Sequence, residues 1–113
     1  MFERVAKFSW LFDKLNVLYI DKLNYRMPVN YRFEDLGGGD STKSYYNRSS
    51  HTIHMTGKLS VITALHEFAH AMGRNERGAV KWSVNLYRVT FPRLFASMEH
   101  DRYMLYSVKG GNA

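Results

Sequence analysis

The sequence predicts a small α+β domain in which helices pack on one sheet. Three observations support this fold class: an amphipathic helical pattern opens the chain, alternating strand patterns follow it, and helical patterns return in the second half. A chain of 113 residues is long enough for one hydrophobic core, so we expect residues 1–113 to form a single domain. We expect a mainly antiparallel sheet of about three strands, packed on a central helix with flanking helices.

The first half of the chain predicts one helix and three strands. Apolar residues recur at spacings of three and four over about residues 2–22, which indicates an amphipathic helix. Residues 25–33 predict a strand with one buried face, because apolar and polar side chains alternate after a proline. A glycine-rich loop at 37–41 precedes a hairpin at 45–55, whose turn we place at 47–50.

The second half predicts three helices. The first begins after residue 57 and ends near residue 72, since Gly73 suits the left-handed C′ position. Asn75 is a good N-cap for a helix over residues 76–90. A proline then ends or kinks this helix, and a last helix is expected to extend to about residue 106, before a loose tail.

Composition excludes several classes of protein. The apolar content of 45% is too high for a disordered chain. The chain has no cysteine, which excludes disulfides, thiolate zinc sites, iron–sulfur clusters and cysteine nucleophiles. Any metal must therefore be held by histidine, carboxylate, backbone or water.

The N-terminal segment predicts neither a signal peptide nor a membrane span. Its apolar residues are interrupted by charges well before the roughly 18–20 residues that a bilayer helix needs. We therefore expect no membrane association and a cytoplasmic location. The charged residues of this segment are Glu3, Arg4, Lys7, Asp13 and Lys14.

The motif His66-Glu67-Phe68-Ala69-His70 indicates a metal site. Two histidines four residues apart lie on one helix face, roughly 6 Å apart at Cβ, where their ring nitrogens can hold one zinc ion. The glutamate after the first histidine lies beside the metal and can act as general base on the zinc-bound water. The surrounding residues are so apolar that this helix should be the buried central one.

This motif, following a hairpin in a small domain, resembles the active-site helix of the zincin metallopeptidases. The resemblance implies a zinc cofactor, hydrolysis of peptide bonds in a protein or peptide substrate, and an edge strand that binds the substrate in extended form. Catalysis would then use Glu67, with His66 and His70 as zinc ligands.

A catalytic zinc site needs a third protein ligand, and Glu76 is the first candidate. The stretch His66-Glu67-x-x-His70-x-x-Gly73-x-x-Glu76 overlays the metzincin pattern, with glutamate in place of the third histidine. Residues 45–92 also resemble the gluzincin-type peptidases of the ImmA/IrrE kind, in which a glutamate on the next helix is the third ligand. Glu76 also begins an apolar stripe that should pack on the motif helix. The alternative ligands are Glu99, His100 and Asp101.

Hydrolysis also needs a donor for the developing oxyanion. We take Tyr103 as the candidate, while His100, Arg102 and Tyr106 remain alternatives. We expect His51 and His54, on the hairpin, to face solvent rather than the metal.

The net charge of +6 is concentrated partly on the helix that follows the motif. Arg74, Arg77, Lys81 and Arg88 form a basic stripe, which we interpret first as a solvated helix face and, as the alternative, as a contact for nucleic acid. The expected function is zinc-dependent peptide hydrolysis. The alternative is a catalytically weak binding or regulatory module on a zincin scaffold, with a nucleic-acid-associated role as one form of it.

Overall fold

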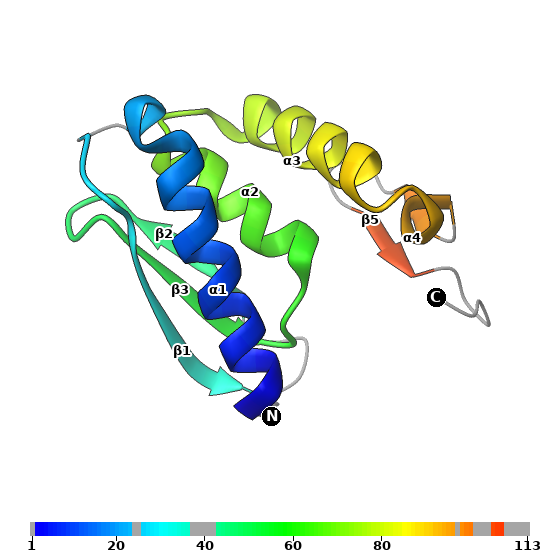
Figure 1. The fold of residues 1–113 in the computed structure, drawn as a ribbon, viewed down its shortest axis with the longest axis horizontal. Helices are drawn as coiled ribbons and strands as arrows, with labels where there is room; N and C mark the ends of the chain where they lie inside the picture. The colour runs from blue at the N-terminus through cyan, green and yellow to red at the C-terminus, as the bar shows by residue number, and fades with distance from the viewer. Residues whose placement is uncertain (1, 24–25, 37–42, 97, 101–104, 108–113) are drawn as a thin grey trace.

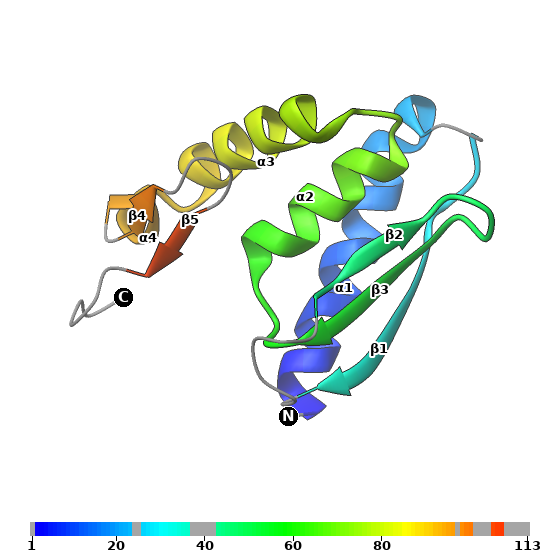
Figure 2. The ribbon, with the colours of Figure 1, turned by 180° about the vertical axis from the view of Figure 1, so that it is seen from behind.

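A three-stranded sheet and three principal helices form the architecture in Figure 1 and Figure 2. The computed structural model describes residues 2–23, 26–36, 43–96, 98–100 and 105–107. The predicted α+β class is confirmed. The elements, in chain order, are α1 (Phe2–Tyr19), a short 3-10 helix (Ile20–Lys22), β1 (Asn30–Leu36), β2 (Tyr45–Asn47), β3 (Thr52–Gly57), α2 (Val61–Ala71), α3 (Glu76–Thr90), α4 (Pro92–Ala96), β4 (Met98–His100) and β5 (Leu105–Ser107).

The sheet is mixed rather than mainly antiparallel. Its strand order is β1-β3-β2, so β3 is central and β2 is an edge strand. β2 and β3 form the predicted antiparallel hairpin, but β1 runs parallel to β3, with Asn30 opposite Thr52. The expectation was wrong for this pair because side-chain alternation identifies the buried face of a strand, not its direction. β1 and β2 lie at opposite edges of this sheet, with β3 between them.

The core lies between one face of the sheet, α1 and α2. Phe12 of α1 stacks on Tyr31 of β1, with ring centroids 5.2 Å apart, and Ile53 and Met55 of β3 are fully buried on the same side. Phe68 of α2 is also fully buried. Each such side chain contributes roughly 1.5–3 kcal/mol of hydrophobic stabilisation. The motif helix is therefore central, as predicted.

The α2–α3 turn matches the local signals of the sequence. Gly73 has a φ of 91°, a conformation that glycine adopts without strain, and it follows the last residues of α2. The side chain of Asn75 accepts a hydrogen bond of 2.8 Å from the backbone N–H of Gly78 and caps α3. The two predicted boundaries are confirmed.

One face of α3 packs on α2, as its spacing predicts. Ala79, Ser83 and Tyr87 are buried there, at successive intervals of four residues. α3 ends at Thr90, and α4 begins at the proline that follows Phe91, which confirms the predicted break.

The expected last helix over residues 92–106 is wrong. α4 has only five residues and is followed by the antiparallel pair β4–β5. Short apolar runs fit helix and strand equally, and the tyrosines of this region favour a strand. The predicted glycine-rich loop and the tail at 108–113 lie outside the described residues.

Candidate metal centre

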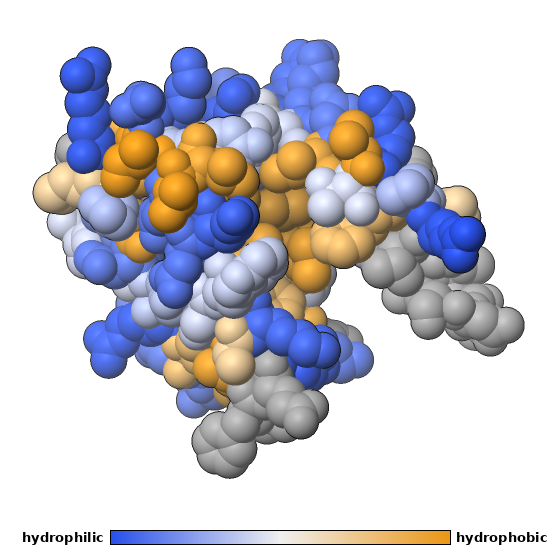
Figure 3. All heavy atoms as spheres, viewed as in Figure 1, coloured by the Kyte–Doolittle hydropathy of each residue, from blue (hydrophilic) through white to orange (hydrophobic). Residues whose placement is uncertain are grey.

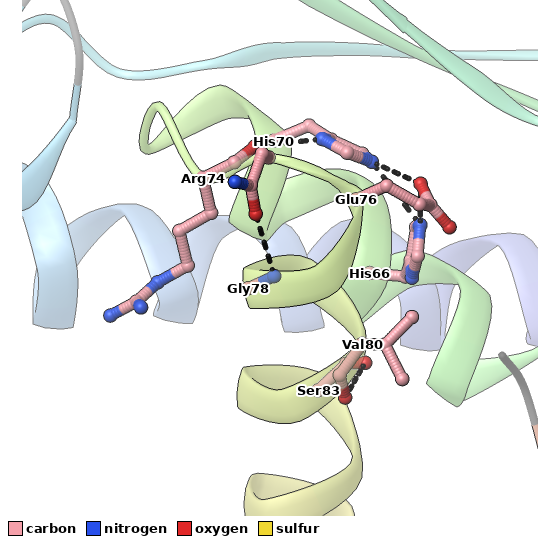
Figure 4. A network of polar contacts seen from close by, with 8 residues as sticks. His66, His70, Arg74, Glu76, Gly78, Val80 and Ser83 are labelled. Atoms are coloured by element: carbon pink, nitrogen blue, oxygen red, sulfur yellow. Dashed lines mark hydrogen bonds and ion pairs between the residues drawn. The ribbon is translucent and has the colours of Figure 1, made fainter.

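Three predicted ligand side chains converge at the α2–α3 turn. His66 and His70 lie one turn apart on α2, and Glu76 is the first residue of α3. The Oε1 atom of Glu76 is 3.0 Å from the Nε2 atom of each histidine, and the two Nε2 atoms are 3.2 Å apart. Figure 4 shows the three side chains pointing toward one another. They form the one group of three or more potential metal ligands found among the described residues.

These distances suit a tetrahedral zinc ion. Two ligand atoms about 2.0–2.1 Å from one tetrahedral zinc lie roughly 3.3–3.4 Å from each other. The observed separations of 3.0–3.2 Å are close to that value. Two imidazole nitrogens and one carboxylate are also a donor set that zinc accepts, and it leaves a fourth position open. The residues present therefore fit the metal that the motif implies.

A backbone contact fixes the orientation of His70. Its Nδ1–H donates a 2.9 Å hydrogen bond to the carbonyl oxygen of Arg74, just past the glycine turn. Because a carbonyl can only accept, Nδ1 carries a proton, and Nε2 is the ring nitrogen that faces Glu76 and is left to bind a metal. Such a contact both orients a metal-binding imidazole and makes it more basic.

His66 is the most buried of the three ligands. Its Nδ1 atom is buried and has no hydrogen-bond partner among the described residues. Burial lowers the pKa of His66, and the contact with Glu76 only partly opposes this shift. The ring therefore stays neutral, the form that binds metal, to more acidic pH than a free imidazole.

Glu76 is held in its ionised form by the two histidines. Partial burial opposes ionisation, but the contacts with His66 and His70 together outweigh it and lower the pKa of the Glu76 carboxyl. At neutral pH this group supplies one negative charge to the centre.

Glu67 lies beside the centre, and its surroundings shift the pKa of its carboxyl in the opposite direction to that of Glu76. Burial raises its pKa to about 7, His70 opposes the shift, and the nearby Glu76 carboxylate adds to it. The backbone N–H of Tyr46, on the edge strand β2, donates a hydrogen bond to the Glu67 carboxylate. A carboxyl whose pKa lies near neutrality can both accept and return a proton.

A pH-dependent stability difference should follow from the burial of Glu67 in the metal-free protein. The carboxyl's contribution to stability is full below the unfolded pKa of 4.5 and is lost as the pH rises through about 7. Glutamine mimics the protonated carboxyl at every pH, so metal-free Glu67→Gln should be more stable than wild type by up to about 3 kcal/mol at pH 8, with little difference near pH 4.5. Urea unfolding of both metal-free proteins across this range measures the difference.

Glu34→Gln is the matched control for this experiment. His54 lowers the pKa of Glu34, so its stabilising contribution grows as pH rises through its titration. That variant should therefore lose a little stability toward neutral pH. A Glu67→Gln difference that stays constant with pH contradicts the burial argument.

A cleft of about 640 Å³ runs from the centre to the edge strand. β2 and the start of the hairpin turn form one wall, and the turn between α2 and α3 forms the other. Glu67, His70 and Glu76 all border this cleft, so the candidate base and two of the candidate ligands share one space. The remaining lining residues are Ser44, Tyr45, Tyr46, Arg48, Gly73, Arg74 and Asn75.

The residues expected further along the chain are not brought to the centre by any described contact. Tyr103, Asp101 and Arg102 lie outside the described residues. Glu99 and His100 belong to β4, and Tyr106 belongs to β5. Figure 2 draws both strands near α4, which follows the end of α3 farther from Glu76. The oxyanion donor therefore stays a prediction.

The two hairpin histidines do not face solvent as expected. His51 is only 4% exposed, because its ring lies between the hydroxyl of Tyr46, 2.6 Å from Nδ1, and the carbonyl oxygen of Met27, 3.1 Å from Nε2. His54 is largely covered, pairs with Glu34 and stacks on Tyr45. Contacts with neighbouring segments of the chain account for the covering of both rings. Neither belongs to the metal-ligand group.

The four basic residues after the motif are all exposed. Arg77, Lys81 and Arg88 lie on the face of α3 away from its buried residues, and Arg74 precedes the helix. This placement agrees with a solvated face and with a nucleic-acid contact alike, so the contact stays a prediction.

Two backbone groups of the site have no counterpart in the sequence pattern. The N–H of Tyr46 reaches Glu67, and the carbonyl of Arg74 orients His70. Backbone groups leave no trace in residue identity. The glycine that precedes Arg74 was the only available signal for the second contact.

Comparison with known proteins adds no family to these observations. No protein-family model, curated protein or solved structure matches the chain. The similarity to zincins therefore remains an expectation based on the motif. None of the described helices is both long and apolar enough to cross a bilayer.

Proposed function

We propose that this protein is a zinc-dependent metallopeptidase of the zincin type. The observation that carries the proposal is the convergence of His66, His70 and Glu76, whose potential ligand atoms all lie within 4.8 Å of one another. The half-buried Glu67 borders the same cleft, and the edge strand β2 forms the opposite wall of that cleft. A peptidase needs a metal site, a base and a surface for an extended peptide, and all three have candidates here.

The residues divide the chemistry between holding the metal and moving a proton. A zinc ion bound by His66, His70 and Glu76 supplies Lewis acidity, which lowers the pKa of water and polarises the peptide carbonyl. Glu67 accepts a proton from the attacking water while the oxygen of that water bonds to the carbonyl carbon of the peptide. Glu67 then returns the proton to the amide nitrogen, and the carbon–nitrogen bond breaks. Tyr103 is proposed as the donor to the developing oxyanion.

The edge strand supports a peptide or protein substrate. β2 is paired on one side only in the three-stranded sheet, so an extended peptide can lie along its open edge. The hydrogen bond from Tyr46 to Glu67 joins this edge to the candidate base. A peptide on β2 would thus pass directly beside Glu67.

Hydrolysis of an unfolded protein substrate tests the proposal. The zinc-loaded full chain should release fluorescent peptides from a densely labelled unfolded protein, stop when a chelator removes the metal, and recover when zinc is restored. Cleavage that continues in excess chelator would contradict the proposal. Stoichiometric zinc without cleavage would favour the alternative, a binding or regulatory module on the same scaffold.

A further inference from the structure

A second hollow in the molecule lies between α1 and α3, away from the metal centre. Two adjoining spaces of about 390 and 460 Å³ form it, and none of their lining residues borders the metal cleft. Trp10, Leu11 and Leu18 of α1 form one wall, Phe91 at the end of α3 forms the other, and Val61 and Leu65 of α2 form the floor. We call this the α1–α3 groove.

The α1–α3 groove exposes large apolar side chains at its rim. Trp10 is 65% exposed and Leu18 is 61% exposed, although other apolar residues of α1 are buried in the core. Figure 3 shows hydrophobic side chains on the surface over α1 and across the region between α1 and α3. A contiguous exposed apolar surface of this kind marks an interaction site more often than a solvated surface.

The shape of the groove suits a helix. Its closed end is the contact between Tyr19 of α1 and Trp82 of α3, whose ring centroids are 5.4 Å apart. From this contact α1 and α3 diverge, with α2 between them, so helices form the walls of the groove (Figure 1). Its lining on α1 extends from Ala6 to Tyr19, a rise of roughly 20 Å, which matches between three and four turns of a partner helix.

The charges of the groove select the kind of helix. Its two charged lining residues are Lys7 and Lys14, and neither forms an ion pair with a side chain that the structure describes. They lie seven residues apart on α1, or roughly 10 Å along the axis, so two carboxylates seven residues apart on a partner helix would match them. We infer that the α1–α3 groove docks an acidic amphipathic helix of a partner protein. This inference does not depend on the proposed peptidase activity.

The probe is a fluorescein-labelled helical peptide of about 16 residues, with leucines on one face and glutamates flanking them. The control peptide has the same sequence with lysine at every glutamate position. Fluorescence anisotropy at low salt, with the full chain, should show that the acidic peptide binds about five- to tenfold more tightly than the control peptide does. The double variant Lys7→Glu/Lys14→Glu should reverse this preference, and Trp10→Ser should weaken the binding of both peptides.

The matched control carries the same change of charge outside the groove. Arg77→Glu/Lys81→Glu alters two exposed residues of α3 and should leave the preference for the acidic peptide in place. Because every altered side chain is exposed, circular dichroism should show an unchanged fold in each variant.

Three results would overturn the inference. One is equal affinity for the two peptides, or no binding of either. Another is a preference that Lys7→Glu/Lys14→Glu does not change, which would show that the net charge of the chain is responsible. The third is a concentration-dependent dimer in sedimentation that Trp10→Ser disperses, which would assign the groove to a second copy of this chain.

Discussion

Replacing Glu67 with glutamine is expected to lower kcat by roughly 10²–10⁴-fold, the usual contribution of a general base. Glutamine keeps the size of the side chain and can still occupy the half-buried position of Glu67, but its amide cannot accept the proton from water. The metal ligands are untouched, so zinc should remain bound at one ion per chain. Initial rates on an unfolded labelled substrate, together with elemental analysis, measure both quantities.

Measuring the zinc content of Glu67→Gln separates the loss of the general base from the loss of the metal site. If Glu67→Gln lost both zinc and activity, the role of Glu67 would lie in building the site. Glu34→Gln is a useful control because it removes a carboxylate of β1 that pairs with His54 and does not line the cleft, and it should leave both measurements near wild type. A turnover of Glu67→Gln close to wild type would remove Glu67 from the mechanism.

The candidate centre could be predicted from the sequence because its members are close along the chain. His66, His70 and Glu76 span eleven residues, and helix periodicity with one glycine turn determines most of their relative placement. The signals are local: Gly73 supplies a left-handed conformation, and Asn75 supplies a cap. The apolar content of the motif helix likewise predicted its burial.

Of the features that escaped prediction, two depend on contacts distant in sequence and the third on a short apolar run. The parallel pairing of β1 with β3 joins residues about twenty positions apart, and strand patterns carry no information on direction. The burial of His51 depends on partners on two other segments, at Met27 and Tyr46. The C-terminal hairpin competes with a helix over a short apolar run, where periodicity does not discriminate.

Replacing Glu76 with alanine should weaken zinc binding more than the roughly 10–100-fold that is typical when an outer-shell partner is lost. The variant removes the only carboxylate of the described ligand group and leaves the two histidines on α2. Competition with a chromophoric chelator at neutral pH measures the affinity. The zinc-dependent activity should fall with zinc occupancy.

The position of Glu76 allows this loss to be separated from unfolding. Its side chain is 58% exposed, so alanine leaves no buried cavity and should change the stability of the metal-free protein little. Glu99→Ala is the matched control, since it removes the rival carboxylate and should keep wild-type affinity. If Glu76→Ala binds zinc as tightly as wild type, the third ligand must instead be sought among Glu99, His100 and Asp101. The contacts of Glu76 with the two histidines would then be hydrogen bonds of the metal-free chain.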